Sequence, residues 1–303
     1  MISFLILLST GYLVGKLGII SRESMPSFAG FLLKVVLPCL NIVLLTERKT
    51  DFFQLLSFSR IILWQVGTYL LMAAIGLLGA RLSGQKDIRT ANVHTGCCIG
   101  GNFAFVVLPL AMVLLDKDTQ ALIPVCAAVD TIVVWTLGLC LFTRGVKSRE
   151  TWTSRLRHFM TPTLVSLLLA LVLNSLGISI PDVIMAPITY ISDISYSLGF
   201  IYVGCSLCYM PRQSLVYVKP VGLVVVGKLL MAPLLIYFIS SAFLTKTESL
   251  LLMMIAGAPT MSTSCSICRQ YGLNEDYAAS AVFVTTLSCM FTIPLVFAII
   301  SLF

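Results

Sequence analysis

The chain has 303 residues, of which 58% are hydrophobic and 11% are charged, and its formal net charge is +7. Soluble domains carry roughly 45–50% apolar and 25% charged residues, so this composition excludes a soluble enzyme. Scattered glycine and proline exclude a collagen-like or disordered chain, and the length excludes a small disulfide scaffold. A membrane protein remains, and the unbroken apolar runs favour helices over a β-barrel, whose strands alternate apolar and polar residues.

Charged and turn-forming residues divide the chain into ten apolar segments, each of a length suited to one transmembrane helix. The first segment has no basic leader and no small-residue cleavage site, so we interpret it as a retained helix rather than a signal peptide. The sequence therefore predicts an all-α polytopic membrane protein with ten spans. They cover about residues 2–20, 27–46, 60–81, 91–115, 119–143, 161–177, 187–209, 217–243, 248–271 and 276–301.

The distribution of lysine and arginine predicts the orientation. Loops after the odd-numbered spans hold thirteen of these residues, and the loops on the opposite face hold five. The positive-inside rule then places the first set in the cytoplasm and both termini outside the plasma (inner) membrane. Loop cations beside anionic lipid account for the net charge, which therefore does not indicate a nucleic-acid partner.

The longest polar stretch, residues 144–160, separates two halves of five spans each, 1–143 and 161–303. Features recur between the halves at an offset of about 157–160 residues, as in LGII from Leu17 and LGIS from Leu176. An odd number of spans forces the two halves to enter the membrane from opposite sides. This pattern indicates an inverted-topology repeat, which is typical of many secondary transporters.

The fourth span of each half carries a helix-breaking cluster at mid-membrane depth. Proline removes a backbone donor, and glycine admits the dihedral angles of an unwound stretch. Unwound backbone at that depth is tolerated only where it is buried in protein or lines a cavity. The alternative is a pair of ordinary kinks, since glycine and proline are frequent in membrane helices. The two clusters are NVHTGCCIGGNFAFVVLPL from Asn92 and MMIAGAPTMSTSCSIC from Met253.

Breaks at these clusters place the N-termini of two half-helices at the bilayer centre. Two positive helix ends that face one point form an anion site without arginine. We expect Thr260 or Ser262 to cap one half-helix, with Pro259 in its first turn. The predicted substrate-binding residues are Gly101, Asn102, Phe103, Pro259, Thr260, Ser262 and Thr263.

Four charged residues cannot easily be assigned to loops or span ends: Lys34, Asp130, Asp193 and Lys228. Charges at this depth usually face the bundle interior, pair with each other or bind ions. Asp130, near the centre of its span, is the main candidate for coupling to H⁺ or Na⁺, and Asp193 is the second. We expect Lys34 and Lys228 to pair with these carboxylates as supporting charges. A purely structural ion pair is the alternative, as is snorkelling of Lys34.

A soft-metal site is a further alternative. His94, Cys97, Cys98, Cys265 and Cys268 lie on the same predicted side of the membrane. Free cysteine is commonly a small buried filler, however, so we expect no metal or other cofactor. The sequence contains no Walker, GxSxG or HExxH motif, and it does not favour an ATP-driven pump or an enzyme.

Segments along the whole chain resemble the auxin efflux carrier family, which includes plant PIN proteins and bacterial malonate-type permeases, within the bile-acid and arsenite transporter superfamily. The resemblance implies two inverted five-helix repeats, with scaffold and transport domains each built from both repeats. It also implies crossing broken helices around an organic anion, an elevator-like motion and a homodimer. The matching segments are GYLVGKLGIIS from Gly11, FLLKVVLPCL from Phe31, GGNFAFVVLPL from Gly100, ISDISYSLGFIYVGCSL from Ile191, KLLMAPLL from Lys228, APTMSTS from Ala258 and YGLNEDYAASAVFVTTLSCMFTIPL from Tyr271.

Carried over by residue, the family's crossover asparagine falls on Asn102 and its second crossover on Pro259. Thr260, Ser262 and Thr263 stand where an asparagine would be expected, which argues against an auxin-like substrate. The short central loop lacks a long hydrophilic insert and favours a bacterial inner-membrane permease.

The sequence thus predicts a secondary transporter that moves a small mono- or dicarboxylate across the plasma membrane. One alternative is a sodium–proton type cation antiporter on the same architecture, in which Asp130 binds the transported ion. The other is a membrane sensor that binds a ligand without transporting it.

Overall fold

The computed structural model describes residues 2–47, 51, 58–85, 87–146, 161–209 and 217–302. Within these ranges the regular structure is helical, apart from one isolated bridge between two residues. Most of the predicted central linker lies outside the described residues. So do eight of the counted loop cations, namely Arg48, Lys49, Lys86, Lys147, Arg149, Arg155, Arg157 and Arg212.

Each of the ten predicted apolar segments contains helix. Several are built from consecutive α-helical and π-helical (η) pieces. In chain order the pieces are α1 (Ile2–Lys16), α2 (Met25–Phe31), η1 (Leu32–Val36), α3 (Leu37–Glu47), α5 (Ser59–Leu82), α6 (Ile88–Ile99), η2 (Phe103–Val107), α7 (Leu108–Leu114), α8 (Lys117–Gln120), α9 (Ile123–Val133), η3 (Val134–Gly138), α10 (Leu139–Phe142), α12 (Pro162–Ser175), α13 (Asp182–Asp193), α14 (Ser195–Cys208), α15 (Val218–Val224), η5 (Val225–Met231), α16 (Ala232–Ser240), α17 (Lys246–Ala256), α18 (Thr263–Tyr271) and α19 (Glu275–Ile300).

Six of the described helical segments are long and apolar enough to cross a membrane. The prediction of an all-α polytopic membrane protein is therefore confirmed, whereas the ten-span inverted repeat stays a prediction. The six segments are Met25–Glu47, Ser59–Leu82, Lys117–Phe142, Asp182–Cys208, Lys219–Ser240 and Glu275–Ile300.

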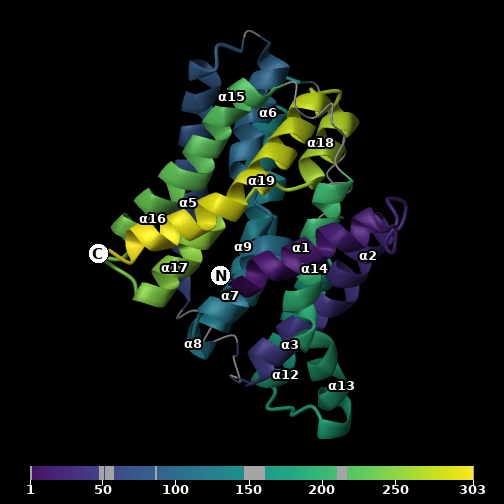
Figure 1. The fold of residues 1–303 in the computed structure, drawn as a ribbon. Helices are drawn as coiled ribbons and strands as arrows, with labels where there is room; N and C mark the ends of the chain where they lie inside the picture. Colours follow the sequence, from purple (N-terminus) through teal and green to yellow (C-terminus); the bar gives the residue numbers. More distant parts are fainter. Residues whose placement is uncertain are drawn as a thin grey trace.

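The helices form two groups that lie side by side (Figure 1). The first group, at the lower right of the view, contains α1, α2, η1, α3, α12, α13 and α14. Within it α1 packs along α14, and α12 packs along α3. The second group contains α5 to α10 and α15 to α19, with α5 against α6, α16 against α17, and α18 against α19. Contacts of α14 with η2 and α7 join the groups.

Small residues allow α1 and α14 to pack backbone against backbone. A Cβ atom added at Gly11 would lie 2.2 Å from the carbonyl oxygen of Ile201, and one at Gly204 would lie 2.1 Å from that of Leu8. The Cys205 thiol donates to the Gly11 carbonyl at 3.0 Å. Because lipid is as apolar as the helices, such close packing rather than a hydrophobic force holds membrane helices together.

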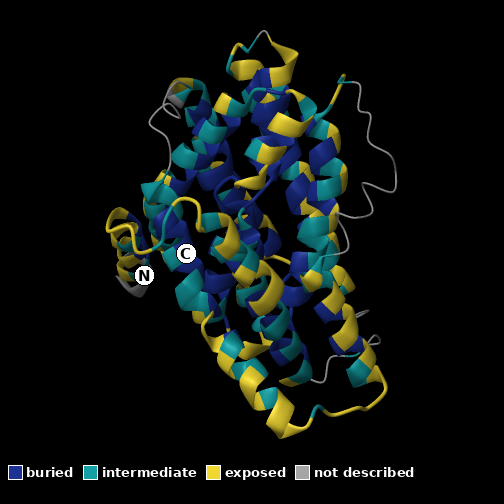
Figure 2. Cartoon of the chain, turned by 90° about the vertical axis from the view of Figure 1, so that its right-hand side faces the viewer, coloured by how far each residue is buried: buried dark blue, intermediate teal, exposed yellow. Residues whose placement is uncertain are grey.

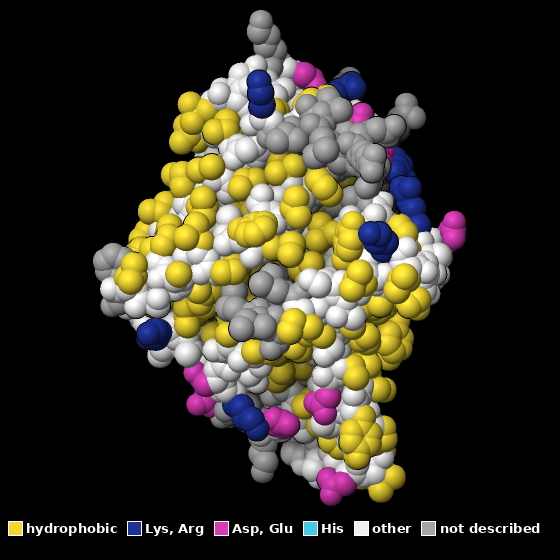
Figure 3. All heavy atoms as spheres, viewed as in Figure 1, with side chains coloured by type: hydrophobic (Ala, Val, Ile, Leu, Met, Phe, Trp, Pro, Cys, Tyr) yellow, Lys and Arg dark blue, Asp and Glu magenta, His cyan; other side chains and the backbone are white. Residues whose placement is uncertain are grey.

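The surface suits a lipid environment. Buried residues run through the interior of the bundle (Figure 2), while large side chains such as Leu63, Val183 and Phe291 are more than two-thirds exposed. Hydrophobic side chains cover the middle of the face shown in Figure 3, and charged side chains lie toward its edges. An apolar surface of this kind would be unfavourable in water but is solvated by acyl chains.

Candidate functional site

The two predicted helix breaks are confirmed. The first broken helix ends at Ile99, where α6 stops, and resumes at Phe103 as η2 and α7. The second ends at Ala256, where α17 stops, and resumes at Thr263 as α18. Both interruptions coincide with the glycine and proline clusters.

The two unwound stretches pair with each other in a short antiparallel bridge between Gly101 and Thr260. The Asn102 amide donates to the Pro259 carbonyl at 2.8 Å, and the Met261 amide donates to the Gly100 carbonyl at 3.1 Å. Backbone groups released by the breaks thus satisfy one another, which unwound backbone at membrane depth requires. We call this region, residues 100–102 and 258–262, the crossing.

Protein donors also occupy the C-terminal end of α6. The Thr260 hydroxyl donates to the Cys97 carbonyl at 3.0 Å, and the Lys228 ammonium donates to the Cys98 carbonyl at 2.6 Å. Lys228 is 1% exposed. The C-terminal end of a helix carries a partial negative charge, so this buried cation is placed where the helix stabilises it.

The predicted pairing of the four intramembrane charges is wrong. Lys228 binds a backbone carbonyl, and Asp130 accepts a hydrogen bond from the Tyr69 hydroxyl. Asp193 is the last residue of α13, in the other helix group from Lys228, and its side chain is exposed. Lys34 is exposed in η1 and forms no ion pair with the described residues. Lys228 is therefore partnered by the C-terminal end of α6 and Asp130 by the Tyr69 hydroxyl, rather than by side chains of opposite charge.

The predicted caps of the second half-helix are also wrong. The Ser262 side chain forms no capping hydrogen bond, the Thr260 hydroxyl is used by α6, and Pro259 lies four residues before α18 begins. Instead, Asn102 caps the other half-helix, because its Oδ1 accepts from the Phe105 amide at 3.3 Å. The bridge pairs the backbone at residues 259–261 with residues 100–102, ahead of the first residue of α18.

A cavity of ≈ 380 Å³ lies between the two helix groups, against the crossing. Seven predicted site residues line it: Lys34, Gly101, Asn102, Phe103, Asp130, Ser262 and Thr263. Four do not: Asp193, Lys228, Pro259 and Thr260. Pro259 and Thr260 belong to the crossing itself, Lys228 binds the Cys98 carbonyl beside it, and Asp193 lies at the end of α13 in the first helix group. The first helix group contributes Leu33, Lys34, Leu37 and Thr161 to Thr163 to the lining.

Both half-helix N-termini face this cavity. Phe103 and Ala104 begin η2, Thr263 begins α18 directly after its N-cap residue Ser262, and all four residues line the cavity. The first amide groups of a helix have no partner within that helix. The positive ends of two helices therefore meet at one space, which is the arrangement that the sequence predicts for an anion.

Two residues of α5 that the sequence analysis does not single out, Gln65 and Tyr69, hold α9 and its Asp130 in place. Gln65 and Tyr69 lie four residues apart on one face of α5, and both are buried. The Gln65 amide donates to the Cys126 carbonyl at 2.9 Å, and the Tyr69 hydroxyl donates to Asp130. Together they fix α9 beside α5. Two polar residues at a spacing of four inside an apolar span are the signal that could have revealed them.

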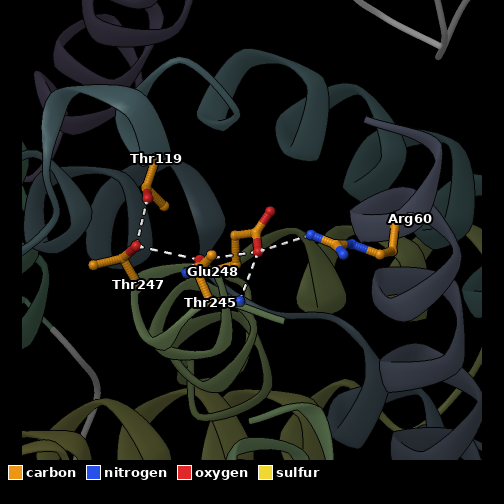
Figure 4. A network of polar contacts seen from close by, with 5 residues as sticks. All are labelled: Arg60, Thr119, Thr245, Thr247 and Glu248. Carbon is orange, nitrogen blue, oxygen red and sulfur yellow. Dashed lines mark hydrogen bonds and ion pairs between the residues drawn. The ribbon is translucent and has the colours of Figure 1, made fainter. Parts of the chain in front are cut away.

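The starts of the first half-helices are anchored away from the crossing. At α17, Thr245 and Glu248 form a capping box, and Glu248 pairs with Arg60 of α5 at 3.6 Å. The Thr119 hydroxyl of α8 donates to Thr247 at 2.8 Å, so the network in Figure 4 ties three helices together.

Asp87 plays the capping role for α6. It accepts from the amides of Arg89 and Thr90. Its hydrogen bond with the Thr90 hydroxyl is the main cause that lowers its pKa below the usual value. Each broken helix is therefore fixed at its outer end and at the crossing.

His94 and the nearby cysteines do not form a metal cluster within the part of the chain that the structure describes. His94 Nδ1 instead shares a hydrogen bond of 2.7 Å with the Tyr277 hydroxyl. Cys97 and Cys268 are buried in one apolar cluster that also contains Tyr277.

The comparison with protein families agrees with this architecture. A family described as membrane transport protein matches residues 1–297. The chain belongs to this family, the auxin efflux carrier family. No curated protein matches the chain. The predicted family is thereby confirmed over nearly the whole length, and the protein is a multi-pass membrane transport protein.

Thr260 gives a direct test of the crossing. Thr260→Val removes the donor to the buried Cys97 carbonyl at nearly constant volume, and we expect it to lower the free energy of unfolding by about 1–3 kcal/mol. Thr292→Val is the matched control, because the Thr292 hydroxyl is buried without a hydrogen-bond partner among the described residues, and its removal should be neutral or stabilising. Denaturant titrations in detergent measure both variants. Equal changes in the free energy of unfolding for Thr260→Val and Thr292→Val would contradict a stabilising hydrogen bond from Thr260 to Cys97.

Proposed function

We propose that this membrane transport protein is a secondary transporter of a small organic anion, a mono- or dicarboxylate, that works by alternating access. The observation that carries the proposal is the convergence of two half-helix N-termini and Asn102 on one cavity. Each helix end supplies about half a positive charge together with first-turn amide donors, of which the Phe105 amide is already held by Asn102 and the Ser264 amide by the Met261 carbonyl. A carboxylate, with two acceptor oxygens, matches these donors.

The Asn102 side chain supports the same chemistry. Its Oδ1 is engaged by the Phe105 amide, which orients the side chain. Its Nδ2 has no hydrogen-bond partner among the described residues, while Asn102 lines the cavity. An amide fixed in this way offers a donor to an anion without the cost of burying a charged arginine.

The arrangement of the helix groups supports an elevator-like motion. The cavity lies between the groups, so displacement of one group against the other would carry a bound anion with the crossing. Packing also repeats between the halves: the first span of each half packs on the second span of the other half, α1 on α14 and α12 on α3. The proposal therefore retains the inverted repeat, the scaffold and transport domains, and a homodimer in the plasma membrane with both termini outside.

Asp130 is the proposed coupling residue because it lines the same cavity as Asn102. Its negative charge would oppose a second negative charge in a confined space of low dielectric. A bound proton or sodium ion would remove that opposition, so the cation and the anion would favour each other's binding. This arrangement fits cotransport better than cation antiport, because a lysine, Lys34, lines the same cavity. Asp193 does not line the cavity and is left out of the coupling step.

Asn102 tests the anion site. Asn102→Ala removes both the Nδ2 donor and the cap of η2. Asn102→Asp keeps an oxygen that can accept from the Phe105 amide, but it removes the Nδ2 donor and adds a negative charge. We expect both variants to lose carboxylate binding at least tenfold, with the stability of Asn102→Asp close to that of the wild type. Uptake into proteoliposomes and thermal unfolding provide the two measurements. Uptake at the wild-type rate in either variant would overturn the site.

Asp130 tests the coupling. Lys34 and Asp130 are the titratable side chains among the described residues that line the cavity, and Tyr69 contacts Asp130. In the wild type, affinity for a monocarboxylate that stays ionised should rise as the pH falls from 8 to 6, by at most about tenfold per pH unit. Asp130→Asn, which is always neutral, should bind with little pH dependence. Binding measured by thermal shift at fixed sodium decides the outcome, and an unchanged pH profile in Asp130→Asn would exclude this role.

A further inference from the structure

Lys34 lies across the cavity from the crossing. It belongs to η1 in the first helix group, whereas Asn102, Ser262 and Thr263 belong to the second. Its side chain is exposed and lines the cavity, and it makes no hydrogen bond or ion pair with the described residues. An intramembrane lysine in this state is expensive unless water or an anion reaches it. Its position differs from that of Lys228, which is buried and bound to a carbonyl.

Lys34 lies within a π-helical turn, η1. Lys34 is the central residue of Leu32–Val36, and the two ends of the turn, Leu32 and Val36, are fully buried. Two other π-helical segments, η2 and η3, also contribute to the lining. Such wide turns inside α-helices occur frequently at functional sites. Here three such segments supply residues that line one cavity.

The charges that face the cavity favour an anion between the two groups. Asp130 is the acidic residue among the described lining residues, and the Tyr69 hydroxyl already donates to it. Lys34 adds a full positive charge on the opposite wall, and the two helix N-termini add partial positive charges at the crossing. A carboxylate there would contact donors from both walls.

We propose that Lys34 is a specificity-determining residue that binds the carboxylate from the first helix group in the conformation described here, and releases it when the crossing moves away. The inference rests on the proposed function, because it needs an anion at the crossing and a displacement between the groups. In the proposed motion, the donors of the crossing move together with the bound substrate, whereas Lys34 stays with the first helix group. Lys34 therefore strengthens binding on the membrane face to which this cavity opens and leaves the other face unaffected.

The test compares substrate affinity on the two membrane faces. Proteoliposomes of fixed orientation are assayed with acetate, lactate, malonate and succinate, first for the wild type and then for Lys34→Gln and Lys34→Arg. We expect Lys34→Gln to raise KM roughly tenfold or more on one face, as the loss of a charge-assisted hydrogen bond does, and by less than about twofold on the other. Lys34→Arg keeps the charge and should stay within about threefold of the wild type.

Lys16→Gln is the matched control, because Lys16 is an exposed cation of the same helix group, on α1, outside the cavity. It should leave KM unchanged on both faces. An equal rise in KM on both faces for Lys34→Gln, or no rise on either, would overturn the role of Lys34 alone, provided that the wild type transports a carboxylate. If the wild type moves none of the four, the proposed function fails and the inference fails with it. Thermal unfolding checks that each variant is folded.

Discussion

The structure depends on the bridge between two interrupted helices. Residues 100–102 and 259–261 exchange backbone hydrogen bonds at the centre of an apolar bundle, where an unpaired amide or carbonyl would cost several kcal/mol. Once these groups are paired, the chain can leave the helical conformation twice at the same depth. The bridge also fixes which ends of the half-helices meet the cavity and which are enclosed by protein.

At the crossing, the C-terminal end of α6 is bound by protein donors, whereas the N-terminal ends of η2 and α18 line the cavity. At the C-terminal end of α6, Thr260 and Lys228 donate to buried carbonyls of the last helical turn, so protein groups offset the partial negative charge of this helix end. At the N-terminal ends of η2 and α18, the first residues line the cavity instead. Among the described lining residues Lys34 is the cationic side chain and Asp130 the acidic one, so the two helix ends add positive character beyond that of the side chains. The anion recognition that we propose would therefore rest mainly on backbone geometry.

Much of this arrangement could be predicted from the sequence, because the bilayer restricts the possible folds. Apolar runs placed the helices, and clusters of glycine and proline placed the breaks, since each signal acts through local geometry. Partners of polar groups could not be predicted in the same way. Lys228 was expected to pair with a carboxylate but binds the Cys98 carbonyl, and Thr260 caps α6 rather than the helix that follows it. The spacing of Gln65 and Tyr69 marks a polar face in an apolar span, but it does not identify Asp130 as the partner of Tyr69. These contacts depend on how helices distant in sequence pack, which no local pattern encodes.

The most direct test of the central claim is to locate a bound carboxylate. A crystal structure with 4-bromobenzoate would mark the anion by the anomalous signal of bromine, because its aryl C–Br bond does not alkylate the free cysteines of the chain. We expect bromine density in the cavity, with a carboxylate oxygen at a hydrogen-bonding distance of about 2.7–3.2 Å from Asn102 Nδ2 and from an amide at the start of α18. A carboxylate bound elsewhere, with the two half-helix N-termini in contact with protein groups alone, would contradict it.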